Sequence, residues 1–116
     1  MKFFPNYIQT EAKDCGPTCL KIIAKHYGRI IRTQELRDLS ETTRGGSSLL
    51  LLSDAAEKIG FRSLGVKTDL KKLNEFPLPC ILHWNNVHFV VLYDIVEKRK
   101  EIAYKISDPG FVLIPL

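Results

Sequence analysis

The pattern of apolar residues changes at Gly60, and this change constrains the fold of the chain more than any other feature. Before Gly60, apolar residues recur at helical spacing, whereas the later runs are rich in β-branched and aromatic residues. Helices followed by an antiparallel meander are typical of the α+β class, with the N-terminal helices packed on the sheet. The 116 residues suit a single domain, residues 1–116, with a helical part at about 14–60 and a sheet part at about 61–116.

Three helices are expected before Gly60, each with a recognisable end. They are residues 17–27 ended by Gly28, a short helix capped by Thr33, and residues 49–59 capped by Ser48 and ended by Gly60. In the short helix, Leu36 and Leu39 should face inward. In the third helix, the buried face should comprise Leu49, Leu52, Ala56 and Ile59, and the four consecutive leucines suggest burial on more than one side.

The pattern after Gly60 predicts five strands, with one short helix between the first and the second. The expected strands are 61–66, 80–84, 87–96, 102–107 and 111–116, and the short helix is 69–76.

Cys15 lies where a polar loop turns into the first expected helix. Pro17 suits the first turn, and Asp14 or Gly16 can cap it. A thiol at a helix N-terminus feels the positive end of the helix dipole, which favours the thiolate. Cys15 is therefore a candidate nucleophile that needs a base.

His88 and Asp108 are the candidate base and its orienting carboxylate. If Asn85–Asn86 forms a two-residue turn, His83 pairs with His88 across the hairpin. If the next loop centres near Lys98, His88 and Asp108 lie directly opposite each other, and the carboxylate can accept the Nδ1–H of the imidazole. His88 can equally be a hydrogen-bonded core histidine, and Asp108 a turn-forming residue.

Two other histidines compete for the role of base. His26, late in the first helix, is more simply a partner of the helix dipole. His83 is the stronger rival, or else an interior neighbour of His88.

A thiol, an imidazole and a carboxylate are the groups that acyl transfer requires. The developing oxyanion needs hydrogen-bond donors, and Gln9 could place its side-chain NH₂ beside the backbone N–H of Cys15. These residues occur in the chain order Gln9, Cys15, His88, Asp108.

The motifs that contain these residues resemble those of the bacteriocin-processing cysteine peptidases, papain-like domains at the N-terminus of peptidase-containing ABC transporters. The resemblance covers essentially the whole chain and rests on residues 7–20, 44–48, 57–61, 83–92 and 106–110, which read YIQTEAKDCGPTCL, RGGSS, EKIGF, HWNNVHFVVL and ISDPG. It implies that Gln9 is the oxyanion-hole residue, Cys15 the nucleophile, His88 the general base and Asp108 its orienter. Cys19 and His83 would be packing residues.

The resemblance also implies a substrate, partners and a location. Such domains cleave leader peptides after a Gly-Gly or Gly-Ala pair and couple the cleavage to export. The partners would be the leader peptide and the transmembrane and ATPase domains of a transporter, at the cytoplasmic face of the membrane. The peptidase domain itself would need no cofactor or metal, because ATP would be used by the separate ATPase domain. Family domains usually continue beyond the Asp-Pro-Gly strand, so we expect this chain to be an excised domain or a short relative.

Composition narrows the function classes further. The net charge of +4 comes from scattered Lys and Arg residues, which indicates a solvated basic surface rather than a nucleic-acid site. No apolar run approaches the length of a membrane span, and the first residues are not a signal peptide. The odd number of cysteines, 3, fits a reducing cytosolic setting.

Three alternatives stay open at this point. The chain could be a catalytically silent docking module that only binds export cargo, which the presence of Cys15 disfavours. It could be another thiol acyl-transfer enzyme, such as a stand-alone peptidase or transpeptidase. It could hold a metal on His83, His88, Asp108 and Cys15, although no paired-ligand spacing supports this.

Overall fold

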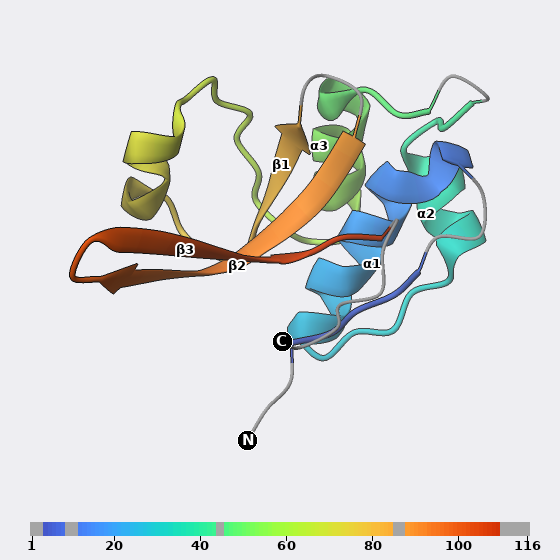
Figure 1. Ribbon diagram of the computed structural model, residues 1–116. Coiled ribbons are helices and arrows are strands. Elements are labelled where there is room, and N and C mark those ends of the chain that lie inside the picture. The colour runs from blue at the N-terminus through green and yellow to red at the C-terminus, as the bar shows by residue number, and fades with distance from the viewer. Residues whose placement is uncertain (1–3, 9–11, 44–45, 85–87, 110–116) are drawn as a thin grey trace.

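The computed structural model describes residues 4–8, 12–43, 46–84 and 88–109. These residues form a 3-10 turn η1 (Ala12–Asp14), helices α1 (Cys15–His26), α2 (Thr33–Leu39) and α3 (Leu49–Lys58), a 3-10 helix η2 (Leu70–Glu75) and strands β1 (Cys80–Trp84), β2 (His88–Lys98) and β3 (Glu101–Ser107). The strands form one antiparallel sheet in the order β1-β2-β3, and the three α-helices lie together beside it (Figure 1). The predicted α+β arrangement is confirmed.

The predicted helix ends are largely confirmed by the backbone. Gly28 and Gly60 follow α1 and α3 with φ values of +86° and +99°, a left-handed conformation that glycine adopts without the steric cost of a Cβ. Ser48 caps α3, since its hydroxyl accepts the Leu51 N–H at 3.1 Å. The prediction for Thr33 was wrong, because the cap residue of α2 is Arg32 in an extended conformation and Thr33 is already helical.

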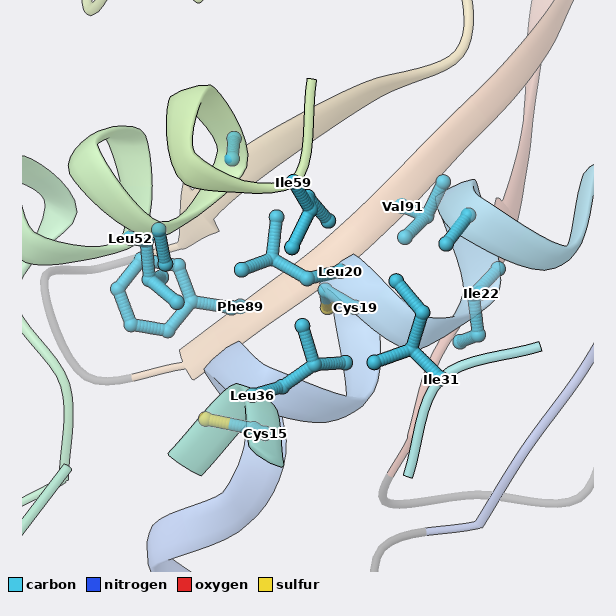
Figure 2. Packing of buried hydrophobic residues seen from close by; sticks show 13 residues of the cluster. Cys15, Cys19, Leu20, Ile22, Ile31, Leu36, Leu52, Ile59, Phe89 and Val91 are labelled. Carbon is cyan, nitrogen blue, oxygen red and sulfur yellow. The ribbon is translucent and has the colours of Figure 1, made fainter. Parts of the chain in front are cut away.

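The centre of the core is the packing of α1 on β2. Cys19, Leu20 and Ile22 of α1 are buried in one cluster with Phe89 and Val91 of β2, and Figure 2 shows these side chains interleaved between the helix and the strand. Both partners are fully apolar here, so the contact removes a large nonpolar area from water.

Helix α3 is buried on one face only. Leu52, Ala55, Ala56 and Ile59 are buried, whereas Leu50 is 71% exposed and Leu49 is 38% exposed. The predictions that Leu49 belongs to the buried face and that the leucines are buried on several sides were therefore wrong. The helix packs against α1 and α2 along one stripe, while its Ser53 and Glu57 contact Ser63 of the segment that follows it.

The segment before η2 also differs from the prediction. Residues 61–69 form no strand, and Leu64 is 85% exposed there. A short apolar run becomes a strand only when an adjacent strand can satisfy its backbone groups, and this segment has no such partner among the described residues. The strand expected at 111–116 lies outside the described residues.

The one-sided burial of α3 gives a matched pair of stability tests. Leu52→Ala should lower the free energy of unfolding by about 2–5 kcal/mol, because it opens a cavity in the core. Leu50→Ala, two residues earlier on the exposed side, should change it by less than about 0.5 kcal/mol. Urea unfolding followed by circular dichroism measures both, and equal losses would contradict the packing described here.

Candidate active site

Cys15 is the first residue of α1. It lies two residues earlier in the helix than the predicted start at Pro17, so its own backbone N–H is at the helix N-terminus. Its side chain is 7% exposed and belongs to the same buried cluster as Leu36 of α2 and Phe89 of β2. The sulfur is visible at the edge of this cluster in Figure 2.

His88 and Asp108 are in direct contact. The Nε2 atom of His88 lies 2.6 Å from Oδ1 of Asp108, with the two side chains 31% and 13% exposed. The imidazole is thus the more accessible member of a partly buried pair, and the carboxylate is the more buried one.

The two residues meet by a different register from the one predicted. Val91 pairs with Ser107 and Leu92 with Ile106, so continuing the ladder by one residue places Asp108 beside Val90 rather than opposite His88. The hairpin turns at residues 99 and 100, and a bulge between Leu92 and Asp94 shifts the register again. The total offset is two residues, an even number, so His88 and Asp108 stay on one face as diagonal neighbours.

The nitrogen that faces the carboxylate also differs from the prediction. It is Nε2, not Nδ1, that donates to Asp108. In the neutral imidazole this hydrogen bond keeps the proton on Nε2 and leaves the lone pair on Nδ1. The nitrogen available to accept a thiol proton is therefore Nδ1.

The pKa of Cys19, which lies one turn into α1, depends on its surroundings. This pKa is raised mainly by burial, and further by electrostatic interaction with Cys15 and Asp108. Cys15 and Asp108 therefore both lie within electrostatic range of the same buried thiol. Cys80 on β1 also has a raised pKa, caused by burial.

His83 and His88 do not lie on the same face of the sheet, so they do not form the shared metal site that one alternative requires. The hairpin pairs His83 with Phe89 and Trp84 with His88, so that His83 and His88 point to opposite faces of the sheet. The His83 ring stacks on Phe89 with centroids 4.1 Å apart, which fits the packing role predicted for it. In the described part of the chain, no three His, Cys, Asp or Glu side chains gather into a possible metal site. His26 ends α1 and lies against Phe4 and Tyr27.

Gln9 lies outside the described residues, but the segment before it is held against the sheet. The Ser107 hydroxyl, which is buried, lies 3.2 Å from the Pro5 carbonyl oxygen and 2.8 Å from Oδ1 of Asn6. Ser107 directly precedes Asp108 in the chain. Ser107 therefore links two parts of the chain: strand β3, which is followed by Asp108, and the segment before Gln9.

The sequence analysis missed a buried ion pair beside Cys15. Asp14 is fully buried and contacts Arg37 of α2 through both carboxylate oxygens. The pair joins residues 23 positions apart, and no local pattern marks it. The only sequence signal is indirect: an acidic side chain at the start of a buried helix needs a cationic partner.

The family of the chain follows from comparison with known proteins. The model of the family described as "Peptidase C39 family" matches residues 4–112, nearly the whole chain. The chain belongs to the peptidase C39 family. It is thus a member of a family of cysteine peptidases, as the resemblance implied.

Relatives of this C39 chain are parts of much longer proteins. The probable microcin-H47 secretion/processing ATP-binding protein MchF of Escherichia coli is 35% identical over 102 residues, which is 88% of this chain and 14% of that protein. The lactococcin-G-processing and transport ATP-binding protein LagD of Lactococcus lactis subsp. lactis is 38% identical over 108 residues, 88% of this chain and 15% of that protein. The chain thus spans about one seventh of the length of these relatives.

A solved structure gives the same fold for the C39 chain. It is a double glycine motif protease from an AMS/PCAT transporter in complex with the leader peptide, with a TM-score of 0.83 and 32% identity over 91% of this chain and 74% of that one. The fold is the papain-like fold of the C39 peptidases, as expected. In the described part of this chain, no helix is long and apolar enough to cross a membrane.

The raised pKa values of two thiols generate a labelling prediction. At pH 7, iodoacetamide should modify Cys15 at least about tenfold faster than Cys19 or Cys80, because Cys15 lies at the positive end of the α1 dipole, whereas burial raises the pKa of the other two thiols. Their labelling should increase as the pH rises toward their raised pKa values. Peptide mass spectrometry measures the three rates, and equal rates at pH 7 would contradict the prediction.

Gly16, beside Cys15, gives a second prediction. A Cβ there would lie 2.9 Å from Leu52 Cδ1 and 2.9 Å from Ser47 Oγ. Gly16→Ala should therefore push aside the buried Leu52 side chain and the Ser47 hydroxyl, lower the free energy of unfolding by about 1–3 kcal/mol and reduce the reactivity of Cys15.

Gly65→Ala is the matched control for this substitution. The nearest atom to its new Cβ is 3.8 Å away, an ordinary contact, so stability should change by less than about 0.5 kcal/mol. A Gly16→Ala variant as stable and reactive as Gly65→Ala would show that the approach of α3 to Cys15 is not tight.

Proposed function

We propose that this C39 domain cleaves the leader peptide of a precursor peptide after a double-glycine motif. Cys15 is the nucleophile, His88 the general base and Asp108 the residue that orients the imidazole. The observation that carries the proposal is the 2.6 Å contact of His88 Nε2 with Asp108, in a chain whose candidate thiol begins a helix. The likeness to a double glycine motif protease solved with a leader peptide supports the choice of substrate.

The geometry of the pair supports a definite division of labour in acyl transfer. Asp108 accepts the Nε2–H of His88, so Nδ1 can take the proton of the Cys15 thiol. The thiolate attacks the carbonyl carbon of the second glycine, and the imidazolium then gives its proton to the leaving amine. A water molecule hydrolyses the thioester, with His88 removing the water proton, and the free thiol is restored.

The negative oxygen of the tetrahedral intermediate needs two donors. In this proposal the backbone N–H of Cys15 is one, because Cys15 is the first residue of α1 and its amide lies at the helix N-terminus. In this proposal the side-chain NH₂ of Gln9 is the other. The contacts of Ser107 with Pro5 and Asn6 support a fixed path for the segment that leads to Gln9.

The setting of the reaction forms part of the proposal. The matched relatives are named as secretion, transport and processing ATP-binding proteins, and this chain matches only a small share of each. We infer that the domain works with the transmembrane and ATPase domains of an ABC transporter at the cytoplasmic face of the membrane, so that cleavage accompanies export. ATP would be used by the ATPase domain, and the peptidase step needs no cofactor.

Incubation with a double-glycine leader peptide tests the function. Wild-type protein should release the leader with the glycine pair at its new C-terminus, and Cys15→Ala should remove all measurable cleavage. Asp108→Ala should lower kcat by up to about 10²–10⁴-fold, the share that positioned acid–base catalysis contributes, because nothing then accepts the Nε2–H of His88 and orients the imidazole. Mass spectrometry of the products identifies the bond that is cut.

Two controls separate the alternatives. Cys80→Ala removes a thiol outside the proposed triad and should leave cleavage unchanged. Excess chelator should also have no effect, since the proposed reaction uses no metal. Cleavage that survives Cys15→Ala would exclude the mechanism, and leader binding without cleavage by wild-type protein would favour the docking module.

A further inference from the structure

The residue before Cys15 carries a buried charge. Asp14 is 0% exposed, and Arg37 donates to both of its oxygens, from Nε to Oδ1 at 2.8 Å and from Nη2 to Oδ2 at 2.6 Å. A two-point contact of this kind fixes the direction of the carboxylate as well as neutralising it. The partner belongs to α2, so the contact ties the start of α1 to a separate helix.

Asp14 occupies the cap position of α1 without capping it. Its side chain accepts no hydrogen bond from the first turn, although aspartate is among the strongest capping residues. One reason lies in the sequence: Pro17, the third helical residue, has no N–H, so one of the two usual donors to a cap side chain is missing. The other reason is Arg37, which draws both carboxylate oxygens toward α2.

The orientation of Asp14 matters for the proposed chemistry at the same helix end. In the proposed mechanism the Cys15 N–H donates to the oxyanion, and the Cys15 thiol loses its proton to become the attacking thiolate. A carboxylate turned toward these amides would compete for the donors at the helix end and place a second negative charge beside the sulfur. With Arg37 in place, the carboxylate points away and its charge is matched.

Arg37 is itself held from its other side. Its Nη1 donates to Oε1 of Gln34, and Gln34 in turn donates from Nε2 to Oδ1 of Asp38 at 2.8 Å. These residues are three and four positions apart, so they share one face of α2. Next to Arg37, Leu36 is fully buried in the core cluster and fixes the helix on the other side.

We propose that Arg37 is a positioning residue of the peptidase: it keeps the Asp14 carboxylate turned away from the N-terminus of α1, where Cys15 reacts. The inference rests on the proposed function. It assigns to α2 a role in catalysis that involves no contact with the substrate.

Kinetics of leader cleavage test this role by separating kcat from KM. Arg37→Met should lower kcat by about tenfold or more and leave KM within about twofold, since the released Asp14 disturbs the charge at Cys15 and not the binding of the leader. Adding Asp14→Ala should restore kcat to within about threefold of wild type, because the unmatched carboxylate is then gone. Arg32→Met, which removes an exposed charge at the start of the same helix, should have no effect on kcat.

A second series keeps the test valid if Arg37→Met does not fold, as circular dichroism would reveal. Arg37→Lys retains the charge but not the two-point contact, so kcat should fall at unchanged KM and recover when Asp14→Ala is added. A folded Arg37→Met, or in its place Arg37→Lys, with wild-type kcat would overturn the inference. So would a double variant no more active than its parent. Failure of the proposed function is a separate result, namely leader cleavage that survives Cys15→Ala.

Discussion

The packing of α1 on β2 is the interaction on which the rest of the structure depends. It buries Leu20 and Ile22 against Phe89 and Val91, and the same contact sets where the two functional ends lie. Cys15 is the first residue of α1, four residues before Cys19. His88 is the first residue of β2, one residue before Phe89. The candidate site therefore lies at the end of a buried contact, which is how a rigid scaffold can hold reactive groups in position.

The residues of the candidate site could be predicted from the sequence, but their detailed geometry could not. Residue types and the position of Cys15 before a helix pointed to a thiol nucleophile, and an even register error kept His88 and Asp108 on one face. The ring nitrogen and the diagonal pairing were not predictable, because they depend on the turn at residues 99 and 100 and on the bulge after Leu92. The position of Asp14 indicated at most that a cationic partner was needed, and nothing marked Arg37 as that partner, since their contact forms only when α2 docks.

The fold was predictable where local chemistry decides it. Gly28, Ser48 and Gly60 act on their own backbone neighbours, and the structure places all three at helix ends. Apolar runs were misleading where burial depends on a distant partner. Residues 61–66 have strand composition but no adjacent strand in the part of the chain that the structure describes. Leu49 and Leu50 are exposed on a helix whose core-facing residues lie on its other side. Periodicity shows which residues could be buried, but not whether another element covers them.

The central claim is that Cys15, activated by the His88–Asp108 pair, attacks the carbonyl carbon of the second glycine of the leader. It is tested most directly with a leader peptide that ends in a glycylglycine chloromethyl ketone, which alkylates a thiol only where the leader places it. The account predicts one adduct per chain, on Cys15, with a rate that falls sharply in His88→Ala and in the presence of excess unmodified leader. Labelling of Cys80 or Cys19, or a rate at Cys15 that is independent of His88 and of the glycine pair, would contradict it.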